Sequence, residues 1–314
     1  PYARIIVDEA RRRGIATDVI DAEGGLFRLT WGGRSIRCRE SLSELTSAVA
    51  LSICDDKRMT RRIVEQAGVR VPERIEADDP AAIADALSRH GALVVKPARG
   101  EQGKGVAVGL TTGDEVAAAV EAARRQCPEV LVEEQVQGED LRLVVIDFKV
   151  VAAALRRPPR VVGDGQSTLR ALIEHQSRRR AAATGGESTI PVDAETERCL
   201  AGAGYSLDDV APEGEEIMVR KAANLHLGGT IHDVTAEVHP TLIRAAVAAA
   251  RAIDISVTGI DLMVESPRAP SYAFIEANER PGLANHEPQP TAERFVDLLF
   301  PLSAPASARA AVQS

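Results

Sequence analysis

The chain has 314 residues, of which 45% are hydrophobic and 27% are charged, so it is rich enough in apolar side chains to bury a core and is not a disordered chain. Its 38 Lys and Arg residues and 46 Asp and Glu residues give a formal net charge of −8, which argues against a protein that coats nucleic acid. The length predicts two packed lobes around one site.

Cysteine usage and apolar runs indicate a cytoplasmic protein. The four cysteines (Cys38, Cys54, Cys127 and Cys199) are far apart and form no CxxC pair, so we expect reduced thiols and neither disulfides nor a zinc site. The best candidate for a membrane span, residues 243–264, is interrupted by four charged residues, and no signal peptide opens the chain. The chain starts without Met in helix-like sequence, which suggests a piece of a longer protein.

The first fifty residues predict a helix, three short strands separated by glycine pairs, and a second helix. The expected ranges are helix 3–13, strands 18–21, 27–30 and 34–37, and helix 42–53. Residues 57–67 then show the 3.6-residue period of an amphipathic helix, which Gly68 and Pro72 end.

Residues 80–134 predict a further helix followed by a strand–loop–strand–helix–strand unit. The expected ranges are helix 80–89, strand 92–97, strand 106–110, helix 114–125 and strand 130–134. Two more strands, 141–147 and 150–155, predict a hairpin that turns at Phe148-Lys149.

Residues 164–216 differ from their surroundings, being polar and rich in arginine, and we interpret them as an insertion. The run Arg178 to Arg180 is interpreted as a solvated face of the helix expected over residues 168–183, in preference to a substrate site. A helix is predicted over residues 240–253, with Pro240 in its first turn.

The most informative stretch is residues 257–278, where two apolar runs flank a loop rich in Pro and Ser. A symmetric hairpin places Val264 opposite Ala273 and Asp261 opposite Glu276, with Asn278 on the same face as Glu276. Oxygen-bearing side chains that converge on one face of an apolar hairpin are costly unless a cation lies among them. We therefore predict that Asp261, Glu276 and Asn278 bind Mg²⁺, which takes its remaining ligands from phosphate and water.

Two glycine-rich loops and several cations indicate a nucleotide. Lys96 ends an apolar strand and is followed by Gly100, Gly103 and Gly105, whose backbone can approach phosphates closely. The segment after the strand 130–134 offers a backbone edge for adenine and a carboxylate for ribose. A second glycine loop, Gly228-Gly229, follows Asn224 and the pair Arg220-Lys221. The nearby His226 and His232 are interpreted as loop or core histidines, as are His239 and His286.

Taken in order, these motifs over residues 55–300 resemble the ATP-grasp superfamily of carboxylate–amine ligases. Within it, Gly163-Asp-Gly165 and the Asn224 to Gly229 loop resemble the cyanophycin synthetase and glutathione synthetase branch, and residues 276–291 resemble N-acetylglutaminylglutamine synthetases. The resemblance implies an α/β chain (α+β type) with the ATP-grasp fold, two α+β lobes with nucleotide between them. The implied parts are an N-terminal segment 1–54, a lid lobe 55–135, a C-terminal lobe 136–302 carrying the insertion 164–216, and a tail 303–314.

The resemblance also implies an ADP-forming reaction in which ATP activates a carboxylate as an acyl phosphate and an amine then forms the amide. It implies two Mg²⁺ ions, with Mn²⁺ as an alternative, held by Asp261, Glu276 and Asn278, and either Arg220 or Lys221 acting with Asn224 on the reacting groups. The implied ATP-binding residues are Lys57, Lys96, Gly100, Gln102, Gly103, Lys104, Gly105, Glu133, Glu134, Val136 and Glu139.

The substrates and partners stay open at the level of the sequence. We expect a small carboxylate and a small amine, such as an amino acid or dipeptide, with no nucleic acid or membrane partner. The leading hypothesis is an ATP-dependent peptide or amide ligase similar to N-acetylglutaminylglutamine synthetases, which form an osmolyte. A homo-oligomer and an acetyltransferase domain upstream of Pro1 are compatible with it. The alternatives are a glutamate ligase that modifies a protein or peptide tail, and a non-catalytic ATP-binding module. Arg156, Arg157 and Arg160 are either carboxylate clamps or an exposed cationic strand end, and His286 with Glu287 is expected beside the amine.

Overall fold

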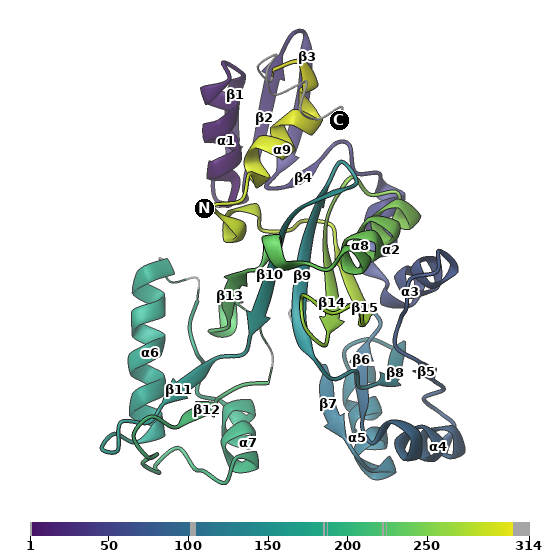
Figure 1. Ribbon diagram of the computed structural model, residues 1–314, viewed down its shortest axis with the longest axis vertical. Helices are drawn as coiled ribbons and strands as arrows, with labels where there is room; N and C mark the ends of the chain where they lie inside the picture. The colour runs from purple at the N-terminus through teal and green to yellow at the C-terminus, as the bar shows by residue number, and fades with distance from the viewer. Residues whose placement is uncertain are drawn as a thin grey trace. The chain divides into compact units, whose positions relative to one another are not determined.

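The computed structural model describes residues 2–100, 105–184, 186, 188–221, 223 and 225–303 (Figure 1). The chain divides into two compact units, one made of residues 1–154 and 233–314 and the other of residues 155–232. The predicted insertion 164–216 lies within the second unit.

The first unit begins with helix α1 (Tyr2–Arg12) and an antiparallel sheet of four strands in the order β1-β2-β3-β4. These strands are β1 (Ala16–Asp21), β2 (Leu26–Trp31), β3 (Arg34–Arg39) and β4 (Leu42–Ser43). Alternate residues Phe27 and Leu29 of β2 are buried, and they belong to a core that α1 shares with α9 (Thr291–Leu299). Helix α1 packs on β1 and β2, and α9 packs on α1, as Figure 1 shows.

The helix expected over residues 42–53 was wrong in its first turn. Leu42 and Ser43 pair with β3, and helix α2 (Ala48–Asp55) begins only after Ser47. The Ser47 side chain accepts a hydrogen bond of 3.0 Å from the backbone of Ala50, which caps the helix. Ser47 therefore marks a boundary that apolar periodicity alone does not show.

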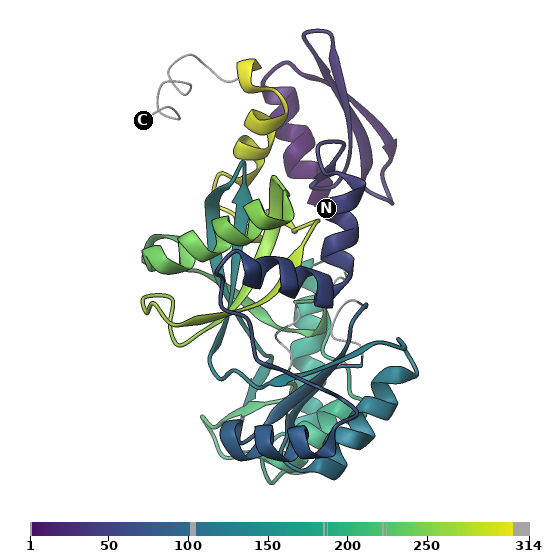
Figure 2. The same cartoon turned by 90° about the vertical axis from the view of Figure 1, so that its right-hand side faces the viewer.

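The predicted strand–loop–strand–helix–strand unit is confirmed. It consists of β6 (Leu93–Pro97), β7 (Ala107–Leu110), α5 (Gly113–Arg124) and β8 (Val130–Glu134). A further strand, β5 (Arg74–Ile75), pairs with β8 and completes a sheet of order β5-β8-β6-β7. Helices α3 (Lys57–Gln66) and α4 (Pro80–His90) precede it, and α4 and α5 cover one face of the sheet, as Figure 2 shows. Val95 of β6, Val120 of α5 and Val132 of β8 are buried between them.

A second sheet, of order β13-β10-β9-β14-β15, carries the predicted carboxylate hairpin. Its strands are β9 (Glu139–Ile146), β10 (Lys149–Arg157), β13 (Thr230–Asp233), β14 (Val257–Val264) and β15 (Tyr272–Asn278). Helix α8 (Pro240–Ile253) packs on β9, β14 and β15. The turn between β9 and β10 uses Asp147 and Phe148, both with positive φ, one residue before the predicted position.

The hairpin of β14 and β15 has the predicted pairing only at the end that carries Asp261 and Glu276. Asp261 lies opposite Glu276, as expected, but Val264 lies opposite Tyr272 and not Ala273. The register shifts by one residue between Asp261 and Leu262, so Ile275 is the extra residue of a β-bulge. The expectation for Val264 was wrong because it assumed a regular ladder.

The second unit contains a two-stranded antiparallel sheet and two helices. Its elements are β11 (Arg160–Val162), α6 (Leu169–Thr184), α7 (Ala194–Gly202), β12 (Glu216–Met218) and the 3-10 turn Leu225–Leu227. Val161, Ile173 and Leu200 contribute to a core of its own. The first unit has three further 3-10 turns, at Thr235–Glu237, Leu283–His286 and Pro301–Ser303.

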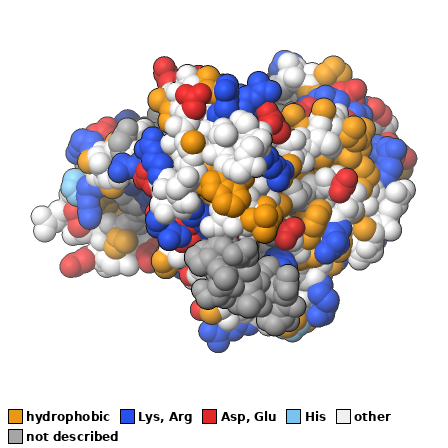
Figure 3. Space-filling model, turned by 90° about the horizontal axis from the view of Figure 1, so that it is seen from above, with side chains coloured by type: hydrophobic (Ala, Val, Ile, Leu, Met, Phe, Trp, Pro, Cys, Tyr) orange, Lys and Arg blue, Asp and Glu red, His pale blue; other side chains and the backbone are white. Residues whose placement is uncertain are grey.

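All four cysteines are free thiols, as predicted, and burial raises the pKa of both Cys38 and Cys54 to about 12. No helix in the described part of the chain has the length and apolar character to cross a membrane. Figure 3 shows Lys and Arg side chains interspersed with Asp and Glu over the visible face, so no single sign of charge dominates that face.

Candidate functional site

The site is built on a row of three charged residues that crosses three adjacent strands of the first unit. Arg142 of β9 lies opposite Asp261 of β14, which lies opposite Glu276 of β15. The Arg142 guanidinium donates to both carboxylate oxygens of Asp261, each at 2.6 Å. Asp261 is 1% exposed, so this bidentate pair neutralises a buried charge.

The predicted metal ligands share one face of the hairpin, and their chemistry suits magnesium. Glu276 is 34% exposed at its side chain and can be reached by a ligand. The Asn278 amide nitrogen lies 3.5 Å from Asp261 Oδ2 and 3.3 Å from the carbonyl oxygen of Gly259. Each carboxylate oxygen of Asp261 keeps a second lone pair, so it can bind a cation while it accepts from Arg142. Carboxylate and amide oxygens are the hard ligands that Mg²⁺ takes, so the donor set fits.

Lys57 lies beside Glu276, at the start of α3. Its Nζ is 4.0 Å from Glu276 Oε2 and donates a hydrogen bond of 2.8 Å to the carbonyl oxygen of Gly100. Asp56 accepts hydrogen bonds from the backbone of Arg58 and Met59 and so fixes the helix start that presents Lys57. The structure thus brings the first predicted phosphate-binding lysine to the start of the glycine loop and to the metal-ligand face.

Lys96 is the second such lysine, and it belongs to a buried ion network. Its Nζ lies 2.6 Å from Glu133 Oε2, and the other carboxylate oxygen of Glu133 lies 2.6 Å from Nε of Arg61. Arg61 also donates to the carbonyl oxygens of Phe274 at 2.8 Å and Ile275 at 3.0 Å. These two carbonyls flank the bulge, so Arg61 satisfies backbone groups that an irregular ladder leaves free.

Burial and neighbouring charge make Lys96 easy to deprotonate. Desolvation is the main cause and the Arg61 cation the second, and together they lower the pKa of Lys96 to about 8, although Glu133 and Glu276 act in the opposite direction. The described network places the cations Lys57, Arg61, Lys96 and Arg142 against the carboxylates of Glu133, Asp261 and Glu276. Its cations outnumber its carboxylates by one, so the network is suited to an anionic ligand.

The predicted adenine and ribose residues lie at the end of β8 and in the segment after it. Glu133 is buried in the network above, whereas Glu134 pairs with Arg70 at 2.9 Å and with His90 at 3.3 Å. The Glu134 amide already donates to the carbonyl oxygen of Glu73. Val136 and Glu139 are both half-buried, and Glu139 begins β9.

The glycine loop is described only at its two ends. Gly100 and Gly105 both have positive φ, and a Cβ added to Gly105 would lie 2.9 Å from Pro97 and from Gln126. A side chain at Gly105 is therefore excluded by strain and by contact. Gln102, Gly103, Lys104 and Asn224 lie outside the described residues.

The two alternative cations of the second unit differ in their surroundings. Arg220 is 3% exposed and binds Asp193 at 2.8 Å and Glu195 at 2.6 Å, which ties it to the first turn of α7. Lys221, the next residue, is exposed. Of the histidines, His239 accepts a hydrogen bond from the backbone of Thr241 and caps α8, which confirms its interpretation as structural.

Arg61 and Arg142 were missed in the sequence. Arg142 lies between Leu141 and Leu143, in the otherwise apolar part of its strand, a signal that alternation could have revealed. Arg61 lies one helical turn after Lys57, on the same face of α3, and so could also have been inferred. Both residues supply the positive charge that the buried carboxylates need.

Comparison with known proteins places this geometry in context. No protein-family model matches the chain. Cyanophycin synthetase of Trichormus variabilis is 32% identical over 96% of this chain and 35% of its own length. The glutathione biosynthesis bifunctional protein GshAB of Clostridium perfringens is 26% identical over 95% of this chain and 40% of its own length. The chain thus spans between a third and two fifths of the length of these curated relatives.

Solved structures show the same fold. A bifunctional glutathione synthetase of Pasteurella multocida superposes with a TM-score of 0.67 and 22% identity, covering 96% of this chain and 43% of that one. D-alanine–D-alanine ligase of Bacillus anthracis gives a TM-score of 0.52 and 17% identity, covering 84% and 71% of the two chains. The chain therefore has the ATP-grasp fold and is related in sequence to cyanophycin synthetase and to the bifunctional glutathione protein GshAB.

Proposed function

We propose that the chain is an ATP-dependent carboxylate–amine ligase that works through an acyl phosphate. The observation that carries this proposal is the meeting of Lys57, Lys96 and Glu276 in one network with an excess of positive charge. Its support from outside the site is the ATP-grasp fold and the relation to synthetases. Because the relatives are much longer, the proposal extends to whatever longer protein contains this chain.

In this proposal the first unit binds the nucleotide. Lys57 and Lys96 hold phosphate oxygens, the segment Glu134 to Val136 receives the adenine, and Glu139 binds the ribose hydroxyls. The backbone N–H groups of Glu134 and Gln135 already donate to the carbonyl oxygens of Glu73 and Ala92, so the adenine would pair with the backbone at Val136. The glycine loop between Gly100 and Gly105 covers the terminal phosphate and keeps water from the activated acid.

Asp261, Glu276 and Asn278 would hold the magnesium ions that accompany ATP. When bound, these ions neutralise charge on the triphosphate, so that a second anion can approach it. Arg142 holds Asp261 in place by two hydrogen bonds and balances its charge when no ion is present. The expected number of two ions and the use of Mn²⁺ as a substitute are part of this proposal.

Of the two cations in the second unit, we propose Lys221 as the group that contacts the reacting acid, together with Asn224. The support is that the Arg220 guanidinium is already bound by two carboxylates and is buried. An exposed ammonium next to it can approach a ligand without breaking a buried ion pair.

The reaction written for these residues balances as two displacements. A carboxylate oxygen attacks the γ-phosphorus of ATP, the bond to the β-phosphate oxygen breaks, and ADP leaves. The amine nitrogen then attacks the acyl carbon, phosphate leaves with the former carboxylate oxygen, and the amine loses a proton. The protein's contribution is to orient two anions against each other and to screen their charges.

For substrates we propose an acylated amino acid and a second amino acid, with acetylated glutamine and glutamine as the first pair. The support is the resemblance of residues 276–291 to N-acetylglutaminylglutamine synthetases, which also suggests an osmolyte product and an upstream acetyltransferase domain. A ligase that adds glutamate to a protein or peptide tail is the second candidate. A module without catalysis is disfavoured by Lys57, Lys96, Asp261, Glu276 and Asn278, all of which are present.

A phosphate-release screen over pairs of acids and amines tests the proposal. We expect ADP and phosphate in equal amounts only when ATP, an acid and an amine are supplied together. ATP hydrolysis that no acid or amine accelerates would contradict the assignment.

A further inference from the structure

The second unit contains a pocket of about 560 Å³ between helix α6 and the segment at β11. Nine described residues line it, and none of the nine is acidic although the chain carries a net charge of −8. Its polar side chains are Arg160, His175, Gln176, Arg179 and Arg180. A concave site of this size with this charge is suited to a small anionic ligand.

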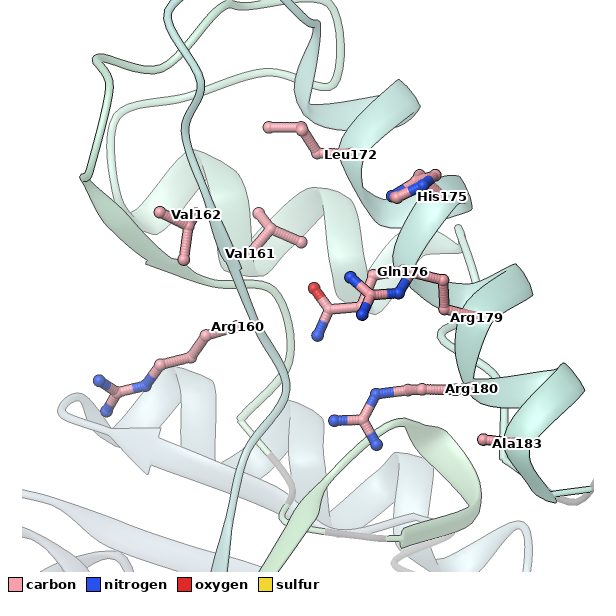
Figure 4. A pocket seen from close by; sticks show the side chains of 9 residues that line it. All are labelled: Arg160, Val161, Val162, Leu172, His175, Gln176, Arg179, Arg180 and Ala183. Atoms are coloured by element: carbon pink, nitrogen blue, oxygen red, sulfur yellow. The ribbon is translucent and has the colours of Figure 1, made fainter.

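Helix periodicity explains why these side chains converge. Leu172, Gln176, Arg179 and Ala183 recur at intervals of three and four residues and so share one face of α6. Figure 4 shows Gln176, Arg179 and Arg180 projecting from α6 into the pocket, with Val161 and Val162 across from them. The interpretation of the arginine run as a solvated face holds for Arg178 and Arg179, which are exposed, but not for the half-buried Arg180. Arg179 also lines the pocket, whereas Arg178 lies outside the lining and 3.9 Å from Glu174.

The three arginines are not equally engaged within the second unit. Arg160 binds Glu216 at 3.1 Å, and Arg180 donates from Nη1 to the carbonyl oxygen of Gly229 at 3.0 Å. Nε of Arg180 is buried and has no hydrogen-bond partner among the residues that the structure describes. Burial also lowers the pKa of Arg180. Arg179 is exposed and Arg180 is half-buried in the lining of the pocket, so the two guanidinium groups can receive carboxylates.

The surroundings favour carboxylates on an aliphatic stem over phosphate. Val161, Val162 and Leu172 supply an apolar wall that a methylene chain can contact. A guanidinium can bind a carboxylate with two parallel hydrogen bonds, and Arg179 and Arg180 each offer such a group to the pocket.

We propose that this pocket, named here the α6 pocket, binds a short acidic peptide through its carboxylates. Arg180 connects the pocket to the second glycine loop, because it donates to the carbonyl oxygen of Gly229 at the end of that loop. The loop is itself held in place, since Gly228 packs so closely on Ile190 that an added Cβ would lie 2.3 Å from it. A ligand held by Arg180 is thus fixed relative to the loop that follows Asn224. That this peptide is the acid substrate rests on the proposed function, whereas the binding itself does not.

Titration calorimetry of the full chain with tri-glutamate, without ATP, tests the α6 pocket. We expect one site that tri-glutamine does not fill and that inorganic phosphate fills more weakly. Arg179→Gln should raise the dissociation constant for tri-glutamate by about tenfold, as expected for the loss of one charge-assisted contact. The matched control Arg178→Gln, which removes the same charge from the adjacent position, should change it by less than about twofold.

Three results would overturn the proposal: no tri-glutamate binding by the unmodified chain, equal losses in the two variants, or phosphate binding more tightly than the peptide. Arg180→Gln is measured in parallel with its thermal transition, since it also loses the bond to Gly229. Ligase turnover in a chain that does not bind tri-glutamate would contradict the proposal for the α6 pocket and leave the proposed function intact. Tri-glutamate binding without ATP-dependent amide formation would instead contradict the proposed function and leave the proposal for the α6 pocket intact.

Discussion

Arg142 and Asp261 lie opposite each other on adjacent strands and share two hydrogen bonds of 2.6 Å, with the carboxylate almost fully buried. A buried carboxylate held in this way is stabilised only while its partner remains, since the lone charge has no water to solvate it. The pair therefore fixes the position of Asp261 before any ligand arrives.

Arg142→Met should lower the free energy of unfolding by about 3 kcal/mol or more, because it leaves the Asp261 carboxylate buried without its cation. Urea denaturation followed by circular dichroism measures this. The control is Arg37→Met, since Arg37 binds Glu44 at 2.7 Å in an exposed pair and should change stability little. Equal effects of the two substitutions would show that the buried pair has no special role.

Glu133 pairs with both Lys96 and Arg61, so Glu133→Gln should be among the most destabilising single changes in the first unit. It leaves two cations buried together, and we expect a loss of about 3–5 kcal/mol in the free energy of unfolding. Glu129→Gln is the matched control, since its carboxylate is 48% exposed and lies 3.9 Å from Arg58. A thermal transition of Glu133→Gln within one or two degrees of the control would contradict the described network.

The lowered pKa of Lys96 predicts that nucleotide binding is coupled to the uptake of a proton. Its pKa is lowered from 10.5 to about 8, so between these pH values the unfolded chain holds a proton that the folded chain has released. Its contribution to stability therefore rises with pH across that window. An anionic phosphate beside Lys96 favours the charged form, so ATP binding near pH 8.5 should take up a fraction of a proton.

Calorimetry in two buffers with different ionisation enthalpies measures this proton uptake. In Lys96→Arg the side chain stays charged over the whole range, so the uptake should disappear while binding persists. The same uptake in that variant would assign the proton to another group.

Glu276→Gln should reduce turnover by about 100-fold or more while leaving the thermal transition nearly unchanged. The Glu276 side chain is partly exposed and its nearest described cation, Lys57, is 4.0 Å away, so folding does not depend on it. Glu265→Gln, in the loop of the same hairpin, serves as the control and should retain activity. Collapse of the fold in Glu276→Gln would mean that this residue is structural.

Stability and activity measurements on alanine variants distinguish the role of Arg220 from that of Lys221. Arg220→Ala should destabilise the second unit, because Asp193 and Glu195 lose their buried partner. Lys221→Ala should leave the thermal transition in place and reduce turnover. The reverse pattern would return the catalytic assignment to Arg220.

The sequence predicted the parts of the fold that depend on local periodicity. The unit of β6, β7, α5 and β8 and the pairing of Asp261 with Glu276 were both found, because apolar alternation and turn residues are local signals. The cap at Ser47 and the bulge at Ile275 were not found, since each depends on which backbone group finds a partner in the folded chain.

The candidate site was predicted as a set of motifs but not as a network. Lys57, Lys96 and Glu276 carry recognisable patterns, whereas Arg61 and Arg142 act through residues that are far away in sequence. Their pairing with Glu133 and Asp261 follows from the sheet register and from the packing of α3, neither of which single-residue spacing encodes. The α6 pocket escaped notice for a similar reason, because Arg178 and Arg179 look alike in sequence and face different surroundings.

The proposed mechanism depends on one step, in which a carboxylate oxygen of the acid substrate attacks the γ-phosphorus of ATP directly. The most direct measurement supplies the acid substrate with ¹⁸O in both carboxyl oxygens and analyses the released phosphate by mass spectrometry. An acyl phosphate requires one ¹⁸O atom in the phosphate for every amide formed. Amide formation that releases unlabelled phosphate would contradict the mechanism proposed for this chain.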